Sequence, residues 1–368
     1  MTQTRRVVAV QLAVGVGDVA GNLRHIRDVV GQAVREYAPE MVFLPESANH
    51  PNIHHPAMRQ VTEPIHGPTL ATLRTLAAEH DCIVGGGYLA VRGHHARGTY
   101  AICEPDGAVS FHDKDQPSMW ENTNYTAGRD LGIADTAAGP IGVANGFEWL
   151  RSRTAGRLRG RVQLVAGGMC FPSFPSWALT RPWFWDREHA TMLELARETP
   201  GRMARVVGAP CVHPAHVGHV RMRTPFAPGV PWPTLLIGET QICDAAGTTV
   251  ASLSTADGEG YVCADVAWEA SRPSNPVPPR FWMPTLPWTV HAVWYATNAS
   301  GRVRYALDHR RRALPWQGTT AEGADLPDRV PAGMLDLPAG VTRGRPAPPP
   351  RRSAPAAAAP PRTARTPS

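Results

Sequence analysis

Lysine is almost absent from this chain of 368 residues. Of its 37 lysine and arginine residues, one is a lysine, Lys114, and all the others are arginines. Arginine carries a planar, permanently charged fork, whereas the lysine ammonium is a compact point charge whose pKa responds to burial. A lysine retained in such a background is a candidate for work that arginine cannot do, such as stabilising an oxyanion or a tetrahedral centre.

Long apolar runs and paired cysteines are also missing. No segment is apolar for the roughly 18 residues that a membrane span needs, so we expect no membrane partner. The six cysteines lie far apart without a CxxC pair, and most fall in apolar, strand-like runs. Free thiols of this kind are typical of a reducing compartment, which predicts a cytoplasmic protein.

The net charge of +6 comes from the C-terminal tail. Residues 341–368 contain six arginines and no acidic residue, so the rest of the chain has 31 basic and 31 acidic residues and is neutral. We therefore expect no nucleic-acid partner. The Pro/Ala/Arg composition of residues 336–368 predicts disorder, because it offers too little apolar surface to fold.

Strand and helix patterns alternate along residues 1–270, and several hairpins interrupt the alternation. Alternation predicts an α/β fold, and the hairpins argue against a purely doubly wound sheet. Two sheets packed face to face with helices outside satisfy both patterns. Residues 271–335 are rich in Pro and Trp and predict an extension that wraps the domain or meets a partner. We expect helices over Val19–Tyr37, Thr69–Ala78, Trp149–Leu158 and His189–Val207, and strands over Arg6–Leu12, Met41–Leu44, Cys82–Tyr88, Gly98–Cys103, Ala108–His112, Ile141–Ala144, Val162–Ala166, Cys211–His213, Thr240–Ser254 (a hairpin) and Gly260–Val266.

Glu46 ends the motif FLPE directly after a short buried strand. The end of a buried strand is where pockets form in α/β sheets. A carboxylate there acts as a general base if burial raises its pKa. The alternative is a capping or salt-bridged glutamate.

Lys114 lies in HDKDQPSMWENTNYTAG, where Pro117 follows it by three residues and Glu121 by seven. After a hairpin strand, this segment predicts an ordered loop of the kind that carries functional residues. Glu121 then either orients a base or contacts substrate, unless it is a solvated loop residue.

Gly146, Phe147 and Glu148 follow a buried strand in GPIGVANGFEWL and precede a predicted helix. A sharp turn between a strand and a helix is where many hydrolases place their nucleophile. We expect these three residues to contact substrate.

In their order along the chain, these motifs resemble the nitrilase superfamily of carbon–nitrogen hydrolases. The resemblance spans about residues 5–267 and includes GRVQLVAGG and a closing hairpin, ETQICDAAGTTVASLSTADGEGYVCADV. It implies a four-layer αββα sandwich, usually assembled as dimers or larger oligomers, acting on a small-molecule substrate without a cofactor. It also implies that Glu46 is the base, Lys114 the stabiliser of the tetrahedral intermediate and Glu121 the second glutamate.

The sequence departs from the family at the nucleophile. The family has cysteine two residues before the acidic residue of the turn, and here that position is Gly146, which offers no nucleophile. Cys170 closes the next strand, and neighbouring strands lie about 5 Å apart, so its thiol is a candidate replacement. The alternative is that Cys170 only packs against or lines the pocket.

Two histidine clusters follow core strands. We expect substrate contacts from their loops rather than a metal site, because no cysteine or carboxylate joins them at ligand spacing. The clusters are His50, His54 and His55, and His213, His216 and His219.

The aromatic stretch Trp177–Trp185 is interpreted as buried packing, with a pocket or an interface as alternatives.

Three interpretations of function stay open. Cys170 acts as a relocated nucleophile, or Glu46 activates water or an amine while Lys114 stabilises the oxyanion. Both would make the protein an enzyme acting on a small amide, a nitrile or a related carbon–nitrogen bond, by hydrolysis, hydration or condensation. The third is a catalytically inactive relative that binds a ligand or scaffolds a partner.

Overall fold

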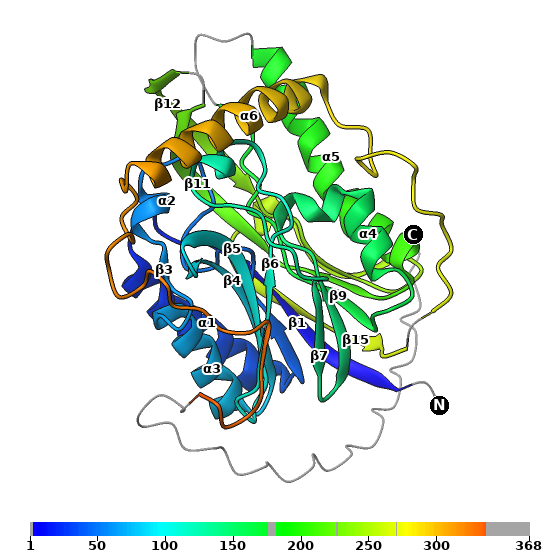
Figure 1. Ribbon diagram of the computed structural model, residues 1–368. Helices are drawn as coiled ribbons and strands as arrows, with labels where there is room; N and C mark the ends of the chain where they lie inside the picture. Colours follow the sequence, from blue (N-terminus) through cyan, green and yellow to red (C-terminus); the bar gives the residue numbers. More distant parts are fainter. Residues whose placement is uncertain (1–2, 176–181, 226, 270, 336–368) are drawn as a thin grey trace, which may run out of the picture.

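Two β-sheets lie face to face between outer helices (Figure 1). The structure is a computed structural model, and it describes residues 3–175, 182–225, 227–269 and 271–335. The prediction of a four-layer αββα sandwich is confirmed.

The larger sheet has ten strands among the described residues, and its central β1 is bordered by parallel β2 and β11 and by antiparallel β15. Its order is β12-β11-β1-β2-β4-β5-β6-β16, with β15 beside β1 and β3 beside β4. The bounds are β1 Thr4–Leu12, β2 Met41–Phe43, β3 Glu63–Pro64, β4 Ile83–Arg92, β5 His95–Cys103, β6 Val109–Asp113, β11 Ala215–Thr224, β12 Ala227–Ile237, β15 Gly260–Ala267 and β16 Arg329–Val330.

In the part of the chain that the structure describes, the smaller sheet has six strands in the order β14-β13-β10-β9-β8-β7. Parallel pairing joins β8, β9 and β10, and antiparallel hairpins form the two edges. The bounds are β7 Ile133–Thr136, β8 Gly139–Val143, β9 Leu164–Ala166, β10 Cys211–His213, β13 Thr240–Cys243 and β14 Thr249–Leu253.

The helices cover the outer faces of both sheets. The α-helices are α1 Val19–Tyr37, α2 Ala57–Gln60, α3 Pro68–His80, α4 Ser152–Leu158, α5 Pro182–Val207 and α6 Trp288–Arg310; the 3-10 helices are η1 Met119–Thr123, η2 Gly146–Leu150 and η3 Thr255–Asp257. None of the helices in the described part of the chain is both long and apolar enough to cross a membrane.

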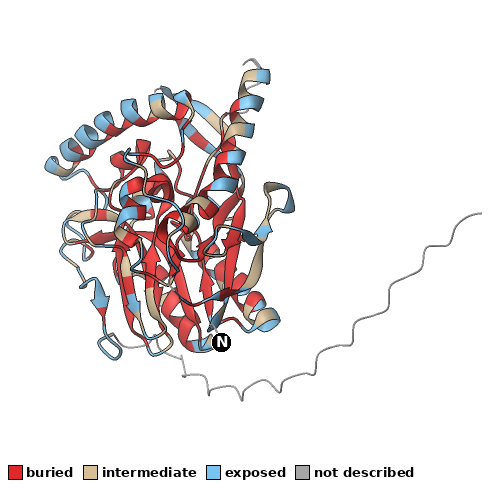
Figure 2. Ribbon diagram, turned by 90° about the vertical axis from the view of Figure 1, so that its right-hand side faces the viewer, coloured by how far each residue is buried: buried red, intermediate tan, exposed pale blue. Residues whose placement is uncertain are grey.

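Side-chain alternation along the strands builds the layers. On β1, Val8 and Val10 face a core shared with α1 and α3, whereas Val7 and Ala9 face the second sheet. Successive residues of a strand point to opposite faces, so an uninterrupted apolar run is what a strand buried on both faces requires. Figure 2 shows burial concentrated in the strands and the inward faces of the helices.

Three local predictions differ from the structure. The helix expected over Trp149–Leu158 is split into η2 and α4, because Arg151 between them is extended (φ −100°, ψ 132°) and bridges to Trp282. Helix α5 begins earlier than expected, at Pro182, a residue whose fixed φ suits a first helical turn. The second histidine cluster is not a loop: His213 lies on β10, and His216 and His219 lie on β11.

The Pro/Trp-rich extension contains the long helix α6. Trp282, Val290 and Trp294 pack into the core that α5 also helps to form. Tyr305 and the following segment 314–321 cover the ends of β4 and β5. Helix α6 runs across one end of the sandwich (Figure 1) and packs against η1, and the extension then continues to β16, which pairs with β6 in the larger sheet. The predicted disorder of residues 336–368 falls outside the described residues, as do residues 177–181 of the aromatic stretch.

Candidate active site

Glu46 stands on a tight turn after β2. Ser47 adopts a left-handed conformation (φ +51°), and the turn packs directly on β4, where Ala48 N–H donates to the Gly87 carbonyl at 2.7 Å. His216 on β11 reaches the same turn, and its Nε2–H donates to the Glu46 carbonyl at 3.0 Å. Burial lowers the pKa of His216 to about 4, so its ring is neutral. The turn is thus fixed by hydrogen bonds with two strands of the larger sheet, β4 and β11.

Gly87 is required for this close approach. A Cβ at position 87 would lie 2.6 Å from Ser47 N and 2.9 Å from Glu46 Cα, and both are main-chain atoms that cannot rotate away. We expect Gly87→Ala to lower the free energy of unfolding by about 1–3 kcal/mol through overpacking. Urea denaturation measures this change.

Gly156→Ala is the matched control, because a Cβ there meets nothing within 4 Å and the residue lies in α4. It should be neutral or slightly stabilising. Equal effects of the two substitutions would show that the turn of Glu46 does not depend on Gly87.

Lys114 lies at the centre of a buried charge cluster. It follows β6, its side chain is fully buried, and its Nζ is 3.2 Å from Glu46 Oε2. The same Nζ is 2.9 Å from the carboxylate oxygens of Glu121 on η1. The three residues that the sequence singled out therefore meet, with one cation between two carboxylates.

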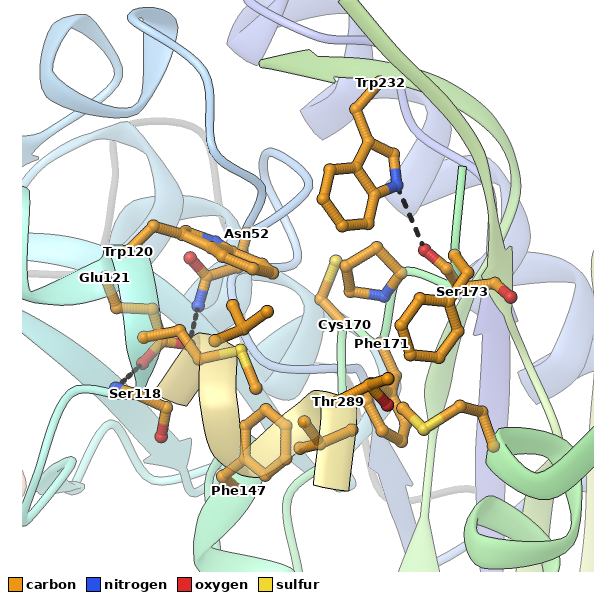
Figure 3. A pocket seen from close by; sticks show the side chains of 16 residues that line it. Asn52, Ser118, Trp120, Glu121, Phe147, Cys170, Phe171, Ser173, Trp232 and Thr289 are labelled. Atoms are coloured by element: carbon orange, nitrogen blue, oxygen red, sulfur yellow. Dashed lines mark hydrogen bonds between the residues drawn. The ribbon is translucent and has the colours of Figure 1, made fainter. Parts of the chain in front are cut away.

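Glu121 is anchored on both sides. The backbone N–H of Ser118 and the amide of Asn52 donate to its carboxylate, the latter at 2.9 Å, as Figure 3 shows. The Ser118–Glu121 pair forms a capping box at the start of η1. Local chain geometry therefore aims this carboxylate at Lys114.

Burial controls the charge of the cluster. It raises the pKa of Glu46 to about 7, although the Lys114 ammonium acts in the opposite direction. Burial tends to lower the pKa of Lys114, but the carboxylates of Glu121 and Glu46 raise it above its usual value. Lys114 is thus charged at neutral pH, while Glu46 can accept or release a proton.

Gly146 lies directly against this cluster. It opens η2 with φ +56°, and a Cβ there would come 2.5 Å from Lys114 Nζ and 2.6 Å from Glu46 Oε1. The Glu46 carboxylate and the Lys114 ammonium thus converge on position 146 and fill the space that a side chain would use. Phe147, the next residue, lines a neighbouring cavity.

Glu148 points the other way, into a buried ion network. Its carboxylate accepts from His112 Nε2 at 2.8 Å, from Arg157 at 2.9 Å, and from the backbone N–H groups of Asn145 and Asp115 at 2.9 and 3.1 Å. It is fully buried and does not line the cavity. The network fixes the loop of Lys114 to the turn of Gly146.

Cys170 stands beyond β9, with its backbone N–H donating to Glu46 Oε1 at 3.1 Å. Its side chain lines the cavity (Figure 3). Burial and the nearby Glu46 carboxylate hold the pKa of the thiol well above its usual value. Cys170 is therefore close to the charge cluster but is protonated at neutral pH, and a thiol is a weak nucleophile.

A narrow cavity of about 40 Å³ lies beside Glu121 and Cys170. A volume of this size holds only a few water molecules or one very small group. Its wall is mostly aromatic and aliphatic, with Trp120 and Trp232 on its two sides (Figure 3). Glu46 and Lys114 do not line it directly.

Sequence reasoning missed part of this wall. Asn52 lies within the first histidine cluster, between His50 and His54, and belongs to no recognisable motif, and Thr289, Val290 and Val293 come from α6. A Pro before an aromatic-rich run (Pro287, then WTVHAVWY) was the one available indication of a helix start. The extension therefore helps to close the cavity.

The histidine clusters do not form a metal site. In residues 3–175, 182–225, 227–269 and 271–335, no group of three or more His, Cys, Asp or Glu side chains could hold a metal ion.

Part of the chain matches a known family model. Residues 6–154 match the carbon-nitrogen hydrolase family model. The match spans 149 of the 368 residues and, together with the fold, supports membership of the nitrilase superfamily and a general carbon–nitrogen hydrolase-like function. No curated protein sequence gives a significant match.

Solved structures share the fold at low sequence identity. A carbon-nitrogen hydrolase from Helicobacter pylori is 14% identical, with a TM-score of 0.58 over 85% of this chain and 98% of that one. A branch 10 nitrilase-superfamily member from Saccharomyces cerevisiae is 20% identical, with a TM-score of 0.53 over 73% and 92%. The amidase from Nesterenkonia sp., solved as a double mutant with acrylamide, is 14% identical, with a TM-score of 0.55 over 71% and 90%.

Proposed function

We propose that this protein hydrolyses a small amide, with Glu46 as general base for water and Lys114 as the stabiliser of the oxyanion. The observation that supports the proposal is the buried cluster itself, in which one ammonium lies between Glu46 and Glu121. Burying three charges is costly, and functional sites are where such clusters are retained. The similarity to an amidase makes an amide the first substrate class to test.

The proposed reaction needs no covalent enzyme intermediate. The Glu46 carboxylate takes a proton from water, and the oxygen attacks the amide carbon to give a tetrahedral oxyanion beside Lys114 Nζ. Protonated Glu46 then gives its proton to the departing amine as the carbon–nitrogen bond breaks, which leaves a carboxylic acid and ammonia or an amine. Glu121 holds Lys114 in place throughout.

The proposal makes a pH prediction. Because the base form of Glu46 is the carboxylate and its pKa is about 7, kcat/KM should rise with pH through about 7 and level off above it. The raised pKa of Lys114 keeps the ammonium charged over this range. A rate that falls between pH 6 and 8 would contradict a carboxylate base.

The test is release of ammonia from a pool of small primary amides and nitriles, with intact-mass analysis. We expect wild type and Cys170→Ala to be active without a covalent adduct, and Glu46→Gln to lose about 10²–10⁴-fold in rate. An adduct on Cys170, with activity lost in Cys170→Ala, would replace this mechanism by a relocated thiol nucleophile.

A second candidate is an inactive relative that binds a small ligand. Two observations favour it: Glu46 and Lys114 do not line the cavity, and together they fill the space at Gly146. If wild type releases no ammonia and Gly146→Cys gains hydrolysis, this second candidate is correct.

A further inference from the structure

A groove rich in arginine lies next to the cavity. We define the arginine groove as Arg59, Arg221, Arg223 and Arg304 with His54 and His55. These residues line two adjoining hollows of about 390 and 540 Å³, which share His55 and Arg223.

Positive charge dominates the arginine groove. Arg59 and Arg304 share one carboxylate, that of Asp308, at 2.8 and 2.9 Å. Within the described residues neither Arg221 nor Arg223 has an ion-pair partner. Four guanidinium groups against one carboxylate leave an excess of three positive charges.

Arg221 and Arg223, which have no ion-pair partner among the described residues, lie on the same face of β11. Arg221 and Arg223 are two residues apart on β11, so their side chains leave the same face, and both are exposed. The strand is held there by loop 52–56, because Arg223 N–H donates to the His54 carbonyl and His54 Nδ1 to the Arg223 carbonyl, both at 2.8 Å. Burial lowers the pKa of His54, which leaves it a neutral donor.

Neighbouring residues line the arginine groove and the cavity at two places. On one side, the rings of Trp120 in the cavity and His54 in the groove lie 6.3 Å apart. On the other, Trp232 lines the cavity and the adjacent Pro231 lines the groove. The groove and the cavity therefore lie next to each other, with Trp120 and Trp232 at the boundary between them.

We propose that the arginine groove binds the anionic end, a carboxylate or a phosphate, of a ligand whose other end enters the cavity. The guanidinium fork matches both anions through paired hydrogen bonds. The proposal rests on the proposed function in one respect, that the ligand is an amide substrate. It adds that this amide carries an anionic group at its far end.

Binding of adipamate, which has an amide at one end and a carboxylate at the other, tests this directly. Hexanamide is the neutral match, and calorimetry at low ionic strength gives both affinities. We expect wild type to bind adipamate at least about tenfold more tightly than hexanamide. The double variant Arg221→Ser/Arg223→Ser should lose that preference and keep its affinity for hexanamide.

Arg24→Ser/Arg129→Ser is the control of equal charge change, since both residues are exposed and lie outside the groove. It should retain the preference for adipamate. Equal affinities of wild type for the two amides, or equal losses in the two double variants, would overturn the proposal. The thermal midpoint of each variant verifies that it is folded.

Free anions separate this proposal from the proposed function. Succinate and inorganic phosphate, titrated alone, should bind wild type and not Arg221→Ser/Arg223→Ser, and their ranking identifies the anion preferred. Such binding without any amide hydrolysis would support anion binding by the arginine groove and contradict the proposed function. If neither anion binds and adipamate does not bind, the arginine groove is not an anion-binding site, whatever the catalytic result.

Discussion

Replacing Glu148 by alanine is expected to lower the free energy of unfolding by about 3–5 kcal/mol, the usual loss when one partner of a buried ion pair is removed. The fully buried carboxylate accepts hydrogen bonds from His112, Arg157 and two backbone N–H groups. The substitution would leave those donors inside the protein without their acceptor. Urea denaturation at pH 7 measures the loss.

Glu194→Ala on α5 is the control, because this glutamate is exposed and should change stability by no more than about 0.5 kcal/mol. Comparable losses in the two variants would show that the buried network contributes little. Because Glu148 fixes the turn of Gly146 to the loop of Lys114, its loss should also reduce any activity of the site.

The same network predicts a pH dependence. Burial opposes the charging of His112, but Glu148 and Asp130 raise its pKa to about 10, compared with 6.5 in the unfolded chain. Its contribution to stability is thus complete below pH 6.5 and is lost as the pH rises through 10. Wild type should lose a few kcal/mol of stability over this interval, and Glu148→Gln distinctly less.

Much of the sandwich could be predicted because its elements have strong local patterns. Val19–Tyr37 was predicted as a helix with its observed bounds, and β1 was recognised from its β-branched run. The strand β12 was missed since it contains Pro231 and Pro233, which normally argue against a strand. They are tolerated because β12 is the edge of its sheet.

The sequence predicted which residues belong to the site, but not how they are arranged in space. Lys114 and Glu121 are seven residues apart in one segment of the chain, and their side chains are in direct contact. Their meeting with Glu46 depends on sheet order, which brings β2, β4, β5 and β6 side by side. The partners of Glu148 likewise come from separate elements, so spacing along the chain gave no indication that it points away from the cavity.

Lys114 offers the other large effect. Replacing it by methionine, which is similar in length and uncharged, leaves the carboxylates of Glu46 and Glu121 facing each other without a cation. We expect a loss of about 3–5 kcal/mol in the free energy of unfolding at pH 8. The loss should be much smaller at pH 5, because the Glu46 carboxyl group, whose pKa is already about 7 in wild type, is then protonated in the folded state.

The sign of this pH effect follows from linkage. Burial already raises the pKa of Glu46 to about 7 with Lys114 present, and removal of the cation raises it further. A carboxyl group whose pKa is higher in the folded than in the unfolded state destabilises the fold as pH rises. The unfolding free energy of Lys114→Met should therefore fall more steeply than that of wild type between pH 5 and 8.

The double variant Lys114→Met/Glu46→Gln separates charge from packing. It removes one of the two opposed carboxylates, so it should recover most of the stability that Lys114→Met loses at pH 8. If Lys114→Met were equally destabilised at pH 5 and pH 8, and the second substitution recovered nothing, the loss would come from packing. The only lysine of the chain would then not be held in place by the charges that surround it.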